Sequence, residues 1–237
     1  MSIEPRRVEI VGVAGTGKST LTRALVEHVP TCRVADSLHT RQPAHWPYVA
    51  HGLPSALSLM ARTTRSRQPL SWDEIKFVLY LFEWGRYLDA QPGLQAGITV
   101  LDQGPLFGLA RLLWGGNPAT RTPHFRAWLT GMVADWSRAL GLVVWLDATD
   151  DVLVERIDRR QQRHEAKGRA REEALGLLER HRDAYGRVLD EVLRLGRLPV
   201  HRLDTSELSE DELVREVVVI FEEAEWLTNR DQALNVR

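Results

Sequence analysis

The sequence predicts an α/β fold in which a five-stranded parallel sheet carries helices on both faces. The first observation is that short apolar runs alternate with segments whose apolar residues recur at helical spacing. The second is that each run ends at a glycine or an aspartate, and parallel sheets bind ligands beyond the carboxyl ends of their strands. The expected strands are 8–11, 31–35, 97–101, 142–146 and 199–203, and they end at Gly12, Asp36, Asp102, Asp147 and Asp204.

Length and composition fit one domain, residues 1–237, with 43% hydrophobic and 27% charged residues. A formal net charge of −1 argues against a general nucleic-acid binder, which needs excess positive charge. No stretch reaches the roughly 20 apolar residues that cross a bilayer. Cys32 is the single cysteine, so an intrachain disulfide is excluded. We expect a cytoplasmic protein that binds neither nucleic acid nor membranes, and a homodimer is one option for its assembly.

The helices are expected between these strands. Segment 71–89 begins with Ser71 as a candidate N-cap and has Glu74 at the capping-box position, which predicts a long helix. By contrast, Pro43, Pro47 and Pro54 predict an irregular loop, and His39, His45 and His51 are expected to lie in that loop without binding a metal. Further helices are expected at 21–29, 106–114, 124–140, 150–163, 171–195 and 209–226, followed by a polar tail at 228–237.

A glycine-rich turn between the first strand and the first helix matches the pattern G-x-x-x-x-G-K-[ST]. Glycines let the backbone N–H groups point inward, where they and the helix N-terminus stabilise phosphate oxygens. Lys18 is expected to reach the β- and γ-phosphates, and the Ser19 hydroxyl to complete a Mg²⁺ site. The alternative is a glycine-rich turn without a ligand. The expected nucleotide-binding residues are Gly12, Ala14, Gly15, Thr16, Gly17, Lys18, Ser19 and Thr20.

Two carboxylates at strand ends are candidates for the chemistry. Asp102 follows an apolar run and is the expected carboxylate ligand of Mg²⁺, which commonly takes one or two such groups. Asp36 is the candidate general base, because an attacking hydroxyl must lose its proton. The alternatives are structural roles, such as a cap or loop hydrogen bond for Asp36. Asp147 is interpreted as structural, because the residues after it indicate a helix start.

Four arginines share one face of the expected helix 150–163, at i, i+3, i+4 and i+7. Cations on one face repel each other unless an anion lies between them, and a transferring phosphoryl group is such an anion. Glu155, Asp158 and Glu165 offer the alternative of a solvated, charge-balanced face. Arg156 and Arg160 are expected to be catalytic, and Arg159 and Arg163 to bind the nucleotide.

With these motifs in order, the chain resembles the P-loop nucleoside and nucleotide kinases, especially the deoxynucleoside and thymidylate kinase branch. The resemblance implies ATP and Mg²⁺ as cofactors, an Arg-rich lid at 150–170, and a helical insertion at 37–96 that binds the phosphate acceptor. It also implies that Asp204 and Thr205 border the adenine. The matching segments are 12–19, 34–36, 101–103, 144–147, 156–163 and 203–206.

The acceptor side departs from the family pattern. Gln103 stands where the family usually has arginine, so one charge near the acceptor is missing. The segment after Asp36 matches neither the deoxynucleoside nor the thymidylate enzymes. Aromatic rings offer flat apolar contact and arginine binds anions, although aromatic residues also serve as plain core. The expected acceptor-binding residues are Asp36, Trp46, Tyr48, Phe77, Tyr80, Trp84 and Arg111.

Two functions are compatible with these patterns. The favoured one is transfer of the γ-phosphate of ATP to a small-molecule acceptor, such as a nucleoside, a nucleotide or another hydroxyl compound. The alternative is a regulatory ATPase or switch that acts through a protein partner. A GTPase switch needs an Asn-Lys-x-Asp motif, and the only lysines are Lys18, Lys76 and Lys167, none of which lies in one. A motor ATPase would show an acidic pair, whereas Gln103 follows Asp102.

Overall fold

The protein is described here by a computed structural model that covers residues 6–36, 42–64, 69–91, 97–159 and 165–227. Its strands form one sheet in the order β2-β3-β1-β4-β5, and every neighbouring pair is parallel. The expected fold class is therefore confirmed. The strands are β1 (Arg6–Val11), β2 (Cys32–Val34), β3 (Ile98–Asp102), β4 (Leu142–Asp147) and β5 (Val200–Asp204).

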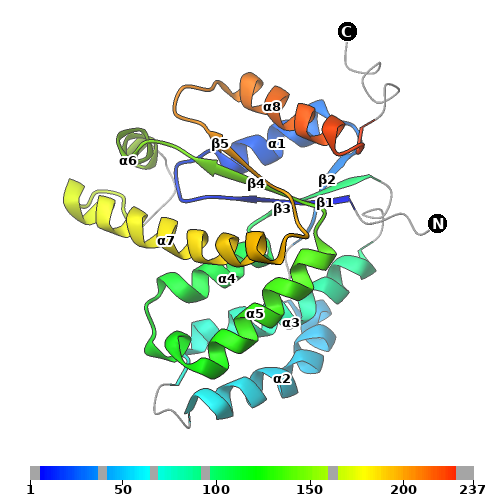
Figure 1. Ribbon diagram of the computed structural model, residues 1–237, viewed down its shortest axis with the longest axis vertical. Helices are drawn as coiled ribbons and strands as arrows, with labels where there is room; N and C mark the ends of the chain where they lie inside the picture. Colours follow the sequence, from blue (N-terminus) through cyan, green and yellow to red (C-terminus); the bar gives the residue numbers. More distant parts are fainter. Residues whose placement is uncertain (1–5, 37–41, 65–68, 92–96, 160–164, 228–237) are drawn as a thin grey trace.

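Helices cover both faces of the sheet (Figure 1). Helices α1 and α8 lie on one face, and α4, α5 and α7 lie on the other, with α2 and α3 packed beyond them. No described helix is both long and apolar enough to span a membrane. The helices are α1 (Lys18–His28), α2 (Trp46–Thr64), α3 (Trp72–Ala90), α4 (Pro105–Trp114), α5 (Pro123–Ala139), α6 (Asp150–Arg159), α7 (Arg171–Leu195) and α8 (Glu210–Glu223), with 3₁₀ turns at Pro43–His45 and Pro118–Arg121.

The central strand β1 divides the core into two apolar clusters. Successive side chains of a strand point to opposite faces, so Val8 and Ile10 pack with α1 and α8, whereas Val11 packs with the α4, α5 and α7 side. The register places Ile10 beside Asp102 on β3 and beside Val144 on β4. The carboxyl ends of these three strands therefore meet at one edge of the sheet.

The prediction of an irregular loop around the prolines is wrong. A 3₁₀ turn at Pro43–His45 leads into helix α2, which continues through Pro54. A proline inside a helix removes a hydrogen bond and costs about 3 kcal/mol or more. Here Pro54 is exposed, while Ala56 and Leu59 bury the opposite face of α2 in the core. The burial of that face against α3 outweighs the local penalty.

The two histidines described in this region also differ from the expectation. His45 is buried and its ring lies 4.7 Å from the ring of Tyr87, while His51 lies on α2 and pairs with Glu83. His39 lies outside the described residues, as does the expected tail at 228–237. Helix α6 is described to Arg159, so the remainder of the expected helix 150–163 also lies outside them.

The N-terminus of α3 shows the capping box that the sequence predicts. The Ser71 side chain accepts a hydrogen bond from the Glu74 backbone, and the Glu74 carboxylate accepts one from the Ser71 backbone. This exchange satisfies two N–H groups that a helix start leaves without intrahelical partners. The capping box therefore defines where α3 begins.

We expect Ser71→Ala to lower the free energy of unfolding by about 1 kcal/mol, the usual loss when an N-cap hydroxyl is removed. Chemical denaturation monitored by circular dichroism measures the change. Ser58→Ala, at an exposed position inside α2, is the control and should stay within about 0.5 kcal/mol of the parent protein. An equal effect of both substitutions would contradict a specific role for the cap.

Candidate active site

The glycine-rich turn runs from the end of β1 to the start of α1, as the sequence predicts. Gly12 has a φ of 147°, and a Cβ atom added to it would lie 2.3 Å from the carbonyl oxygen of Leu146 on β4. Only glycine fits so close to that backbone. Gly17 is the N-cap of α1, with a φ of 92°. The turn therefore leads directly into a helix N-terminus, where anions are stabilised.

Lys18 folds back over this turn. Its Nζ donates to the carbonyl oxygens of Gly12 at 2.7 Å and Val13 at 2.9 Å. The buried Thr16 hydroxyl donates to the Val13 carbonyl at 2.9 Å, inside the same turn. The ammonium group is thus held at the loop where the motif predicts phosphate binding.

Ser19 and Asp102 meet next to the turn, at the end of β3. The Ser19 hydroxyl donates to Oδ2 of Asp102 at 2.9 Å, while Oδ1 is buried and hydrogen-bonds to no residue that the structure describes. Mg²⁺ prefers oxygen ligands and keeps several waters or phosphate oxygens. Within the described ranges, no three His, Cys, Asp or Glu side chains could hold a metal among themselves. The pair therefore fits Mg²⁺ that takes its other ligands from phosphate and water.

A cavity of about 340 Å³ opens beside the turn. Arg156 borders it and joins three segments: Nη2 donates to the carbonyl of Thr205 at 2.7 Å, and Nη1 donates to the Thr205 hydroxyl at 3.0 Å and to the Gly15 carbonyl at 3.4 Å. Arg156 thus connects α6 to both walls of the cavity. The lining residues are Gly15, Thr16, Gly17, Thr20, Leu21, Arg156, Arg159, Thr205, Leu208, Ser209, Glu210 and Leu213.

Of the other residues expected to bind the nucleotide, some line this cavity and others do not. Arg159 lines the cavity but is exposed and pairs with Glu155, as the alternative of a charge-balanced face requires. Asp204 lies outside this cavity, and its carboxylate accepts hydrogen bonds from the Ser206 hydroxyl and backbone N–H, which lower the pKa of Asp204. Arg160 and Arg163 lie outside the described residues.

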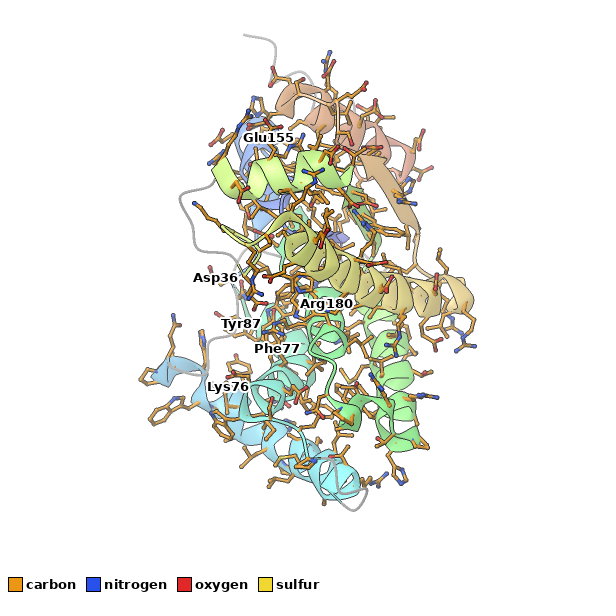
Figure 2. The ribbon with its side chains drawn as sticks, turned by 90° about the vertical axis from the view of Figure 1, so that its left-hand side faces the viewer. Asp36, Lys76, Phe77, Tyr87, Glu155 and Arg180 are labelled. Carbon is orange, nitrogen blue, oxygen red and sulfur yellow. The ribbon has the colours of Figure 1, made fainter. Side chains whose placement is uncertain are left out.

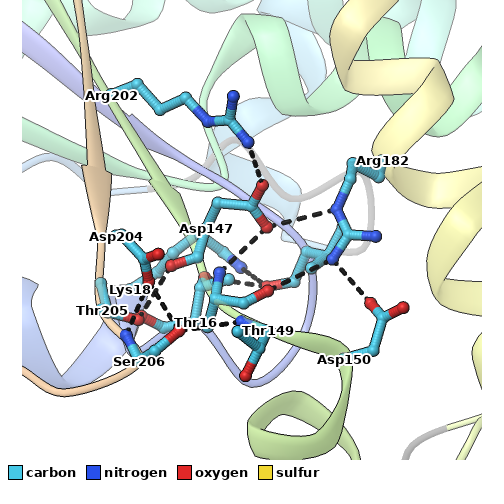
Figure 3. Close-up of polar contacts among 12 residues, drawn as sticks. Thr16, Lys18, Asp147, Thr149, Asp150, Arg182, Arg202, Asp204, Thr205 and Ser206 are labelled. Atoms are coloured by element: carbon cyan, nitrogen blue, oxygen red, sulfur yellow. Dashed lines mark hydrogen bonds and ion pairs between the residues drawn. The ribbon is translucent and has the colours of Figure 1, made fainter.

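A polar network connects the turn to the ends of β4 and β5 (Figure 3). The Thr205 hydroxyl donates to the carbonyls of Thr16 and Asp147, and the Thr205 N–H donates to the same Asp147 carbonyl at 2.8 Å. The Asp147 carboxylate lies between Arg182 of α7, at 3.2 Å, and Arg202 of β5, at 2.7 Å. These contacts agree with the structural role expected for Asp147.

On the other side of the turn, Asp36 follows β2 and is held by helix α3. Gln91 donates to the Asp36 carbonyl at 3.0 Å and accepts from the Asp36 N–H at 3.0 Å, and Trp84 Nε1 donates to the same carbonyl at 3.4 Å. The Asp36 carboxylate is exposed and has no hydrogen-bond partner among the described residues. The described hydrogen bonds of Asp36 therefore hold its backbone, and none of them involves its carboxylate.

Aromatic side chains of α3 continue from Asp36 along the same side of the molecule, which faces the viewer in Figure 2. Tyr87 lies near Asp36: burial raises the pKa of its hydroxyl, and the Asp36 carboxylate raises it further. Tyr80 stacks on Trp84 at 4.7 Å and donates from its hydroxyl to the Gln103 carbonyl at 3.1 Å. Helix α3 thus contacts both residues that follow the sheet edge, Asp36 and Gln103.

A second cavity, of about 510 Å³, lies between the start of α3 and the end of α4. Phe77 and Arg111 both line it, and the Arg111 guanidinium lies 5.9 Å from the Phe77 ring centre and 5.2 Å from that of Trp114. Arg111 forms no ion pair with any described carboxylate. Held between two rings, its N–H groups can bind an acceptor-rich or anionic group.

The remaining expected acceptor-binding residues do not all lie near Asp36 or the second cavity. Trp84 is only 1% exposed and packs against Trp136, so it supports the backbone of Asp36 from inside the core. Tyr48 of α2 makes an edge contact with Tyr87 at 5.3 Å. Trp46 is 60% exposed at the start of α2 and belongs to neither cavity described above.

Sequence reasoning missed two residues that hold this site. Gln91 lies in no recognisable motif. Its amide binds the backbone of Asp36, which is distant in the sequence, so only the folded structure reveals this contact. Glu9 did carry a signal, an acidic residue inside the apolar strand β1. It is fully buried, and burial raises the pKa of Glu9 to about 8, although hydrogen bonds from the backbones of Leu106 and Phe107 lower it.

No protein-family model matches the sequence, and no curated protein matches it either. Solved structures do match the fold. Thymidylate kinase from Candida albicans superposes with a TM-score of 0.56 at 16% identity, covering 94% of this chain and 93% of that chain. Deoxyadenosine kinase from M. mycoides with bound dATP gives 0.53 at 14% identity, covering 91% and 98%.

A further structure of the M. mycoides deoxyadenosine kinase, with bound dCTP, gives a TM-score of 0.53 at 13% identity and covers 92% of this chain and 99% of that one. The likeness spans nearly the whole length of each protein. At this identity it establishes the arrangement of sheet and helices. The chain thus has the fold of the nucleoside and nucleotide kinases that its motifs resemble.

Proposed function

We propose that the protein is an ATP-dependent phosphotransferase that moves the γ-phosphate to a small-molecule acceptor, a nucleoside or a nucleotide. The observation that carries the proposal is the position of the phosphate-binding turn. It lies between a cavity bordered by Arg156 and Thr205 and the exposed carboxylate side of Asp36. A phosphotransferase needs its donor on one side of such a turn and its acceptor on the other.

On the donor side, the proposal places the phosphates on the turn and the base in the cavity of about 340 Å³, where Leu208 and Leu213 offer apolar contact. Lys18 would leave its backbone carbonyls to bind the β- and γ-phosphates, and Ser19 with Asp102 would hold Mg²⁺. The ion supplies charge neutralisation for the phosphate oxygens. Arg156 supports this arrangement by joining both walls of the cavity.

When the acceptor is a nucleoside, its hydroxyl oxygen forms a bond to the γ-phosphorus while the bond from that phosphorus to the bridging oxygen of ADP breaks. The hydroxyl proton passes to Asp36, whose carboxylate has no competing hydrogen bond among the described residues. A positioned carboxylate of this kind contributes about 10²–10⁴-fold to such a transfer. The backbone contacts from Gln91 and Trp84 supply the positioning.

The acceptor itself is assigned to the insertion at 37–96 and to α4. Phe77 offers a flat apolar face, and the neighbouring Arg111 offers planar N–H donors. Together they favour a planar, acceptor-rich ring such as a nucleobase. The lid assigned to 150–170 and the nucleotide contacts of Arg159, Arg160 and Arg163 belong to the same proposal.

The direct test measures ADP release by purified protein with Mg·ATP, in the presence of nucleosides, nucleoside monophosphates and other hydroxyl compounds. Release that depends on one acceptor class supports the proposal and names the class. If ATP binds but no acceptor stimulates release, the alternative of a regulatory ATPase that needs a protein partner is favoured instead.

We expect Lys18→Ala to lower kcat/KM by about 10²–10³-fold, because it removes a charge that faces the transferring phosphoryl group. The melting temperature should change little, since Lys18 is not part of the core. Arg194→Ala is the control: this arginine is exposed near the end of α7 and, among the residues that the structure describes, it pairs with Glu191 alone. Near-normal turnover in Lys18→Ala would rule out the phosphate-binding role of the turn.

Replacement of Asp36 separates base catalysis from nucleotide binding. We expect Asp36→Asn to lower kcat by at least about 10²-fold, the smaller end of general-base effects, with an unchanged Kd for ATP. Stopped-flow or steady-state kinetics and calorimetry measure the two quantities. Asp135→Asn, at an exposed aspartate of α5 that pairs with Arg138, is the control. An unchanged kcat would assign Asp36 to structure alone.

A further inference from the structure

Glu9 is an acidic side chain in the middle of the central strand. Its neighbours in the strand, Val8 and Ile10, are apolar, and all three are completely buried. Glu9 forms no ion pair with any described residue. A buried carboxylate without a cationic partner is unfavourable unless hydrogen bonds satisfy its oxygens. Such a group needs a specific reason to be there.

The oxygens of Glu9 are satisfied by the start of helix α4. Oε2 accepts from the Leu106 N–H at 2.9 Å and Oε1 accepts from the Phe107 N–H at 2.8 Å. These belong to the first N–H groups of a helix, which have no partner inside it. The N-cap of α4 is Gly104, which has no side chain to bind them. Glu9 therefore caps α4 from a different element.

Gly104 and Glu9 fit together as a pair. A Cβ atom added to Gly104 would lie 2.4 Å from Cδ of Glu9, so the backbone of the turn rests directly on the carboxylate. The φ of Gly104 is −74°, which any residue adopts. The glycine is required there by the closeness of the carboxylate and not by the backbone conformation.

The turn that Glu9 holds also carries the candidate metal ligand. Gly104 is two residues after Asp102, and Gln103 between them has a φ of 67°, which is uncommon for a residue other than glycine. The Tyr80 hydroxyl holds the Gln103 carbonyl at 3.1 Å. Glu9 and Tyr80 thus both hold the turn through hydrogen bonds to its backbone or to the helix start that follows it. With the turn in this position, Asp102 lies at Ser19.

We propose that Glu9 is a positioning residue, which fixes the turn between β3 and α4 so that the Asp102 carboxylate stays at Ser19 for a divalent cation bound with the nucleotide. This inference rests on the proposed function, because it takes the Ser19–Asp102 pair as the cation site. Glu9 itself touches neither the nucleotide cavity nor the acceptor side.

The test compares ADP binding with and without Mg²⁺ by titration calorimetry, in the parent protein and in Glu9→Gln. The amide of glutamine has only one acceptor oxygen, so its NH₂ group would face one of the two helix N–H groups and displace the turn. We expect metal-free ADP affinity to change by less than about twofold, and the tightening caused by Mg²⁺ to fall by up to about tenfold, the upper end of the usual effect of losing one hydrogen bond.

The outcomes separate this inference from the proposed function. If Mg²⁺ tightens ADP binding equally in the parent protein and in Glu9→Gln, the inference is wrong while the proposed function stands. If Mg²⁺ does not tighten ADP binding in the parent protein, the metal assignment is wrong and the inference falls with it.

Glu83→Gln is the matched control for loss of a buried carboxylate. Glu83 is 3% exposed, and it pairs with His51 and Arg86 rather than with the backbone of the turn. The substitution Glu83→Gln should lower the melting temperature and leave the tightening of ADP binding by Mg²⁺ unchanged. An equal loss of the Mg²⁺ effect in Glu83→Gln would mean general loosening and would overturn the inference.

Gly104→Ala keeps the inference testable if Glu9→Gln does not fold. Its methyl group would push the turn off the carboxylate while Glu9 itself is retained. We expect the same loss of the Mg²⁺ effect as in Glu9→Gln. An undiminished Mg²⁺ effect in Gly104→Ala would contradict the positioning role.

Discussion

The site depends on one arrangement of backbone hydrogen bonds, the parallel pairing of β1 with β3 on one side and β4 on the other. This pairing places the end of β1 beside Asp102 and close to the Leu146 carbonyl, against which Gly12 packs. A parallel sheet gathers the carboxyl ends of its strands at one edge, where α-helix N-termini also point. The glycine-rich turn, the contact between Ser19 and Asp102, and the polar network of Asp147 all lie at that shared edge.

The two sides of the turn are held by different kinds of interaction. On the nucleotide side, hydroxyl and guanidinium groups of Thr205 and Arg156 bind backbone carbonyls, so the cavity is bordered by polar contacts. On the acceptor side, packed rings of α3 carry the hydrogen bonds that position Asp36 and Gln103.

Local patterns predicted most of the elements. Each expected strand is present, although β2 is shorter than expected, and α3 begins at the predicted capping box. The failure at α2 has a clear physical cause. Proline acts through one missing hydrogen bond, which local reasoning counts, whereas burial of Ala56 and Leu59 against another helix is a long-range effect that it cannot count.

The candidate phosphate site at residues 12–19 could be predicted without tertiary information, because the spacing of its glycines, lysine and serine between a strand and a helix is typical of such a site. Only the tertiary structure decides whether the carboxylate of an aspartate after a strand is exposed or is bound by other side chains. Asp147 is enclosed by two arginines, while the Asp36 carboxylate is left exposed by partners that bind its backbone. Those partners come from residues tens of positions away, and hydrogen bonds between distant segments leave no periodic or local trace in a sequence.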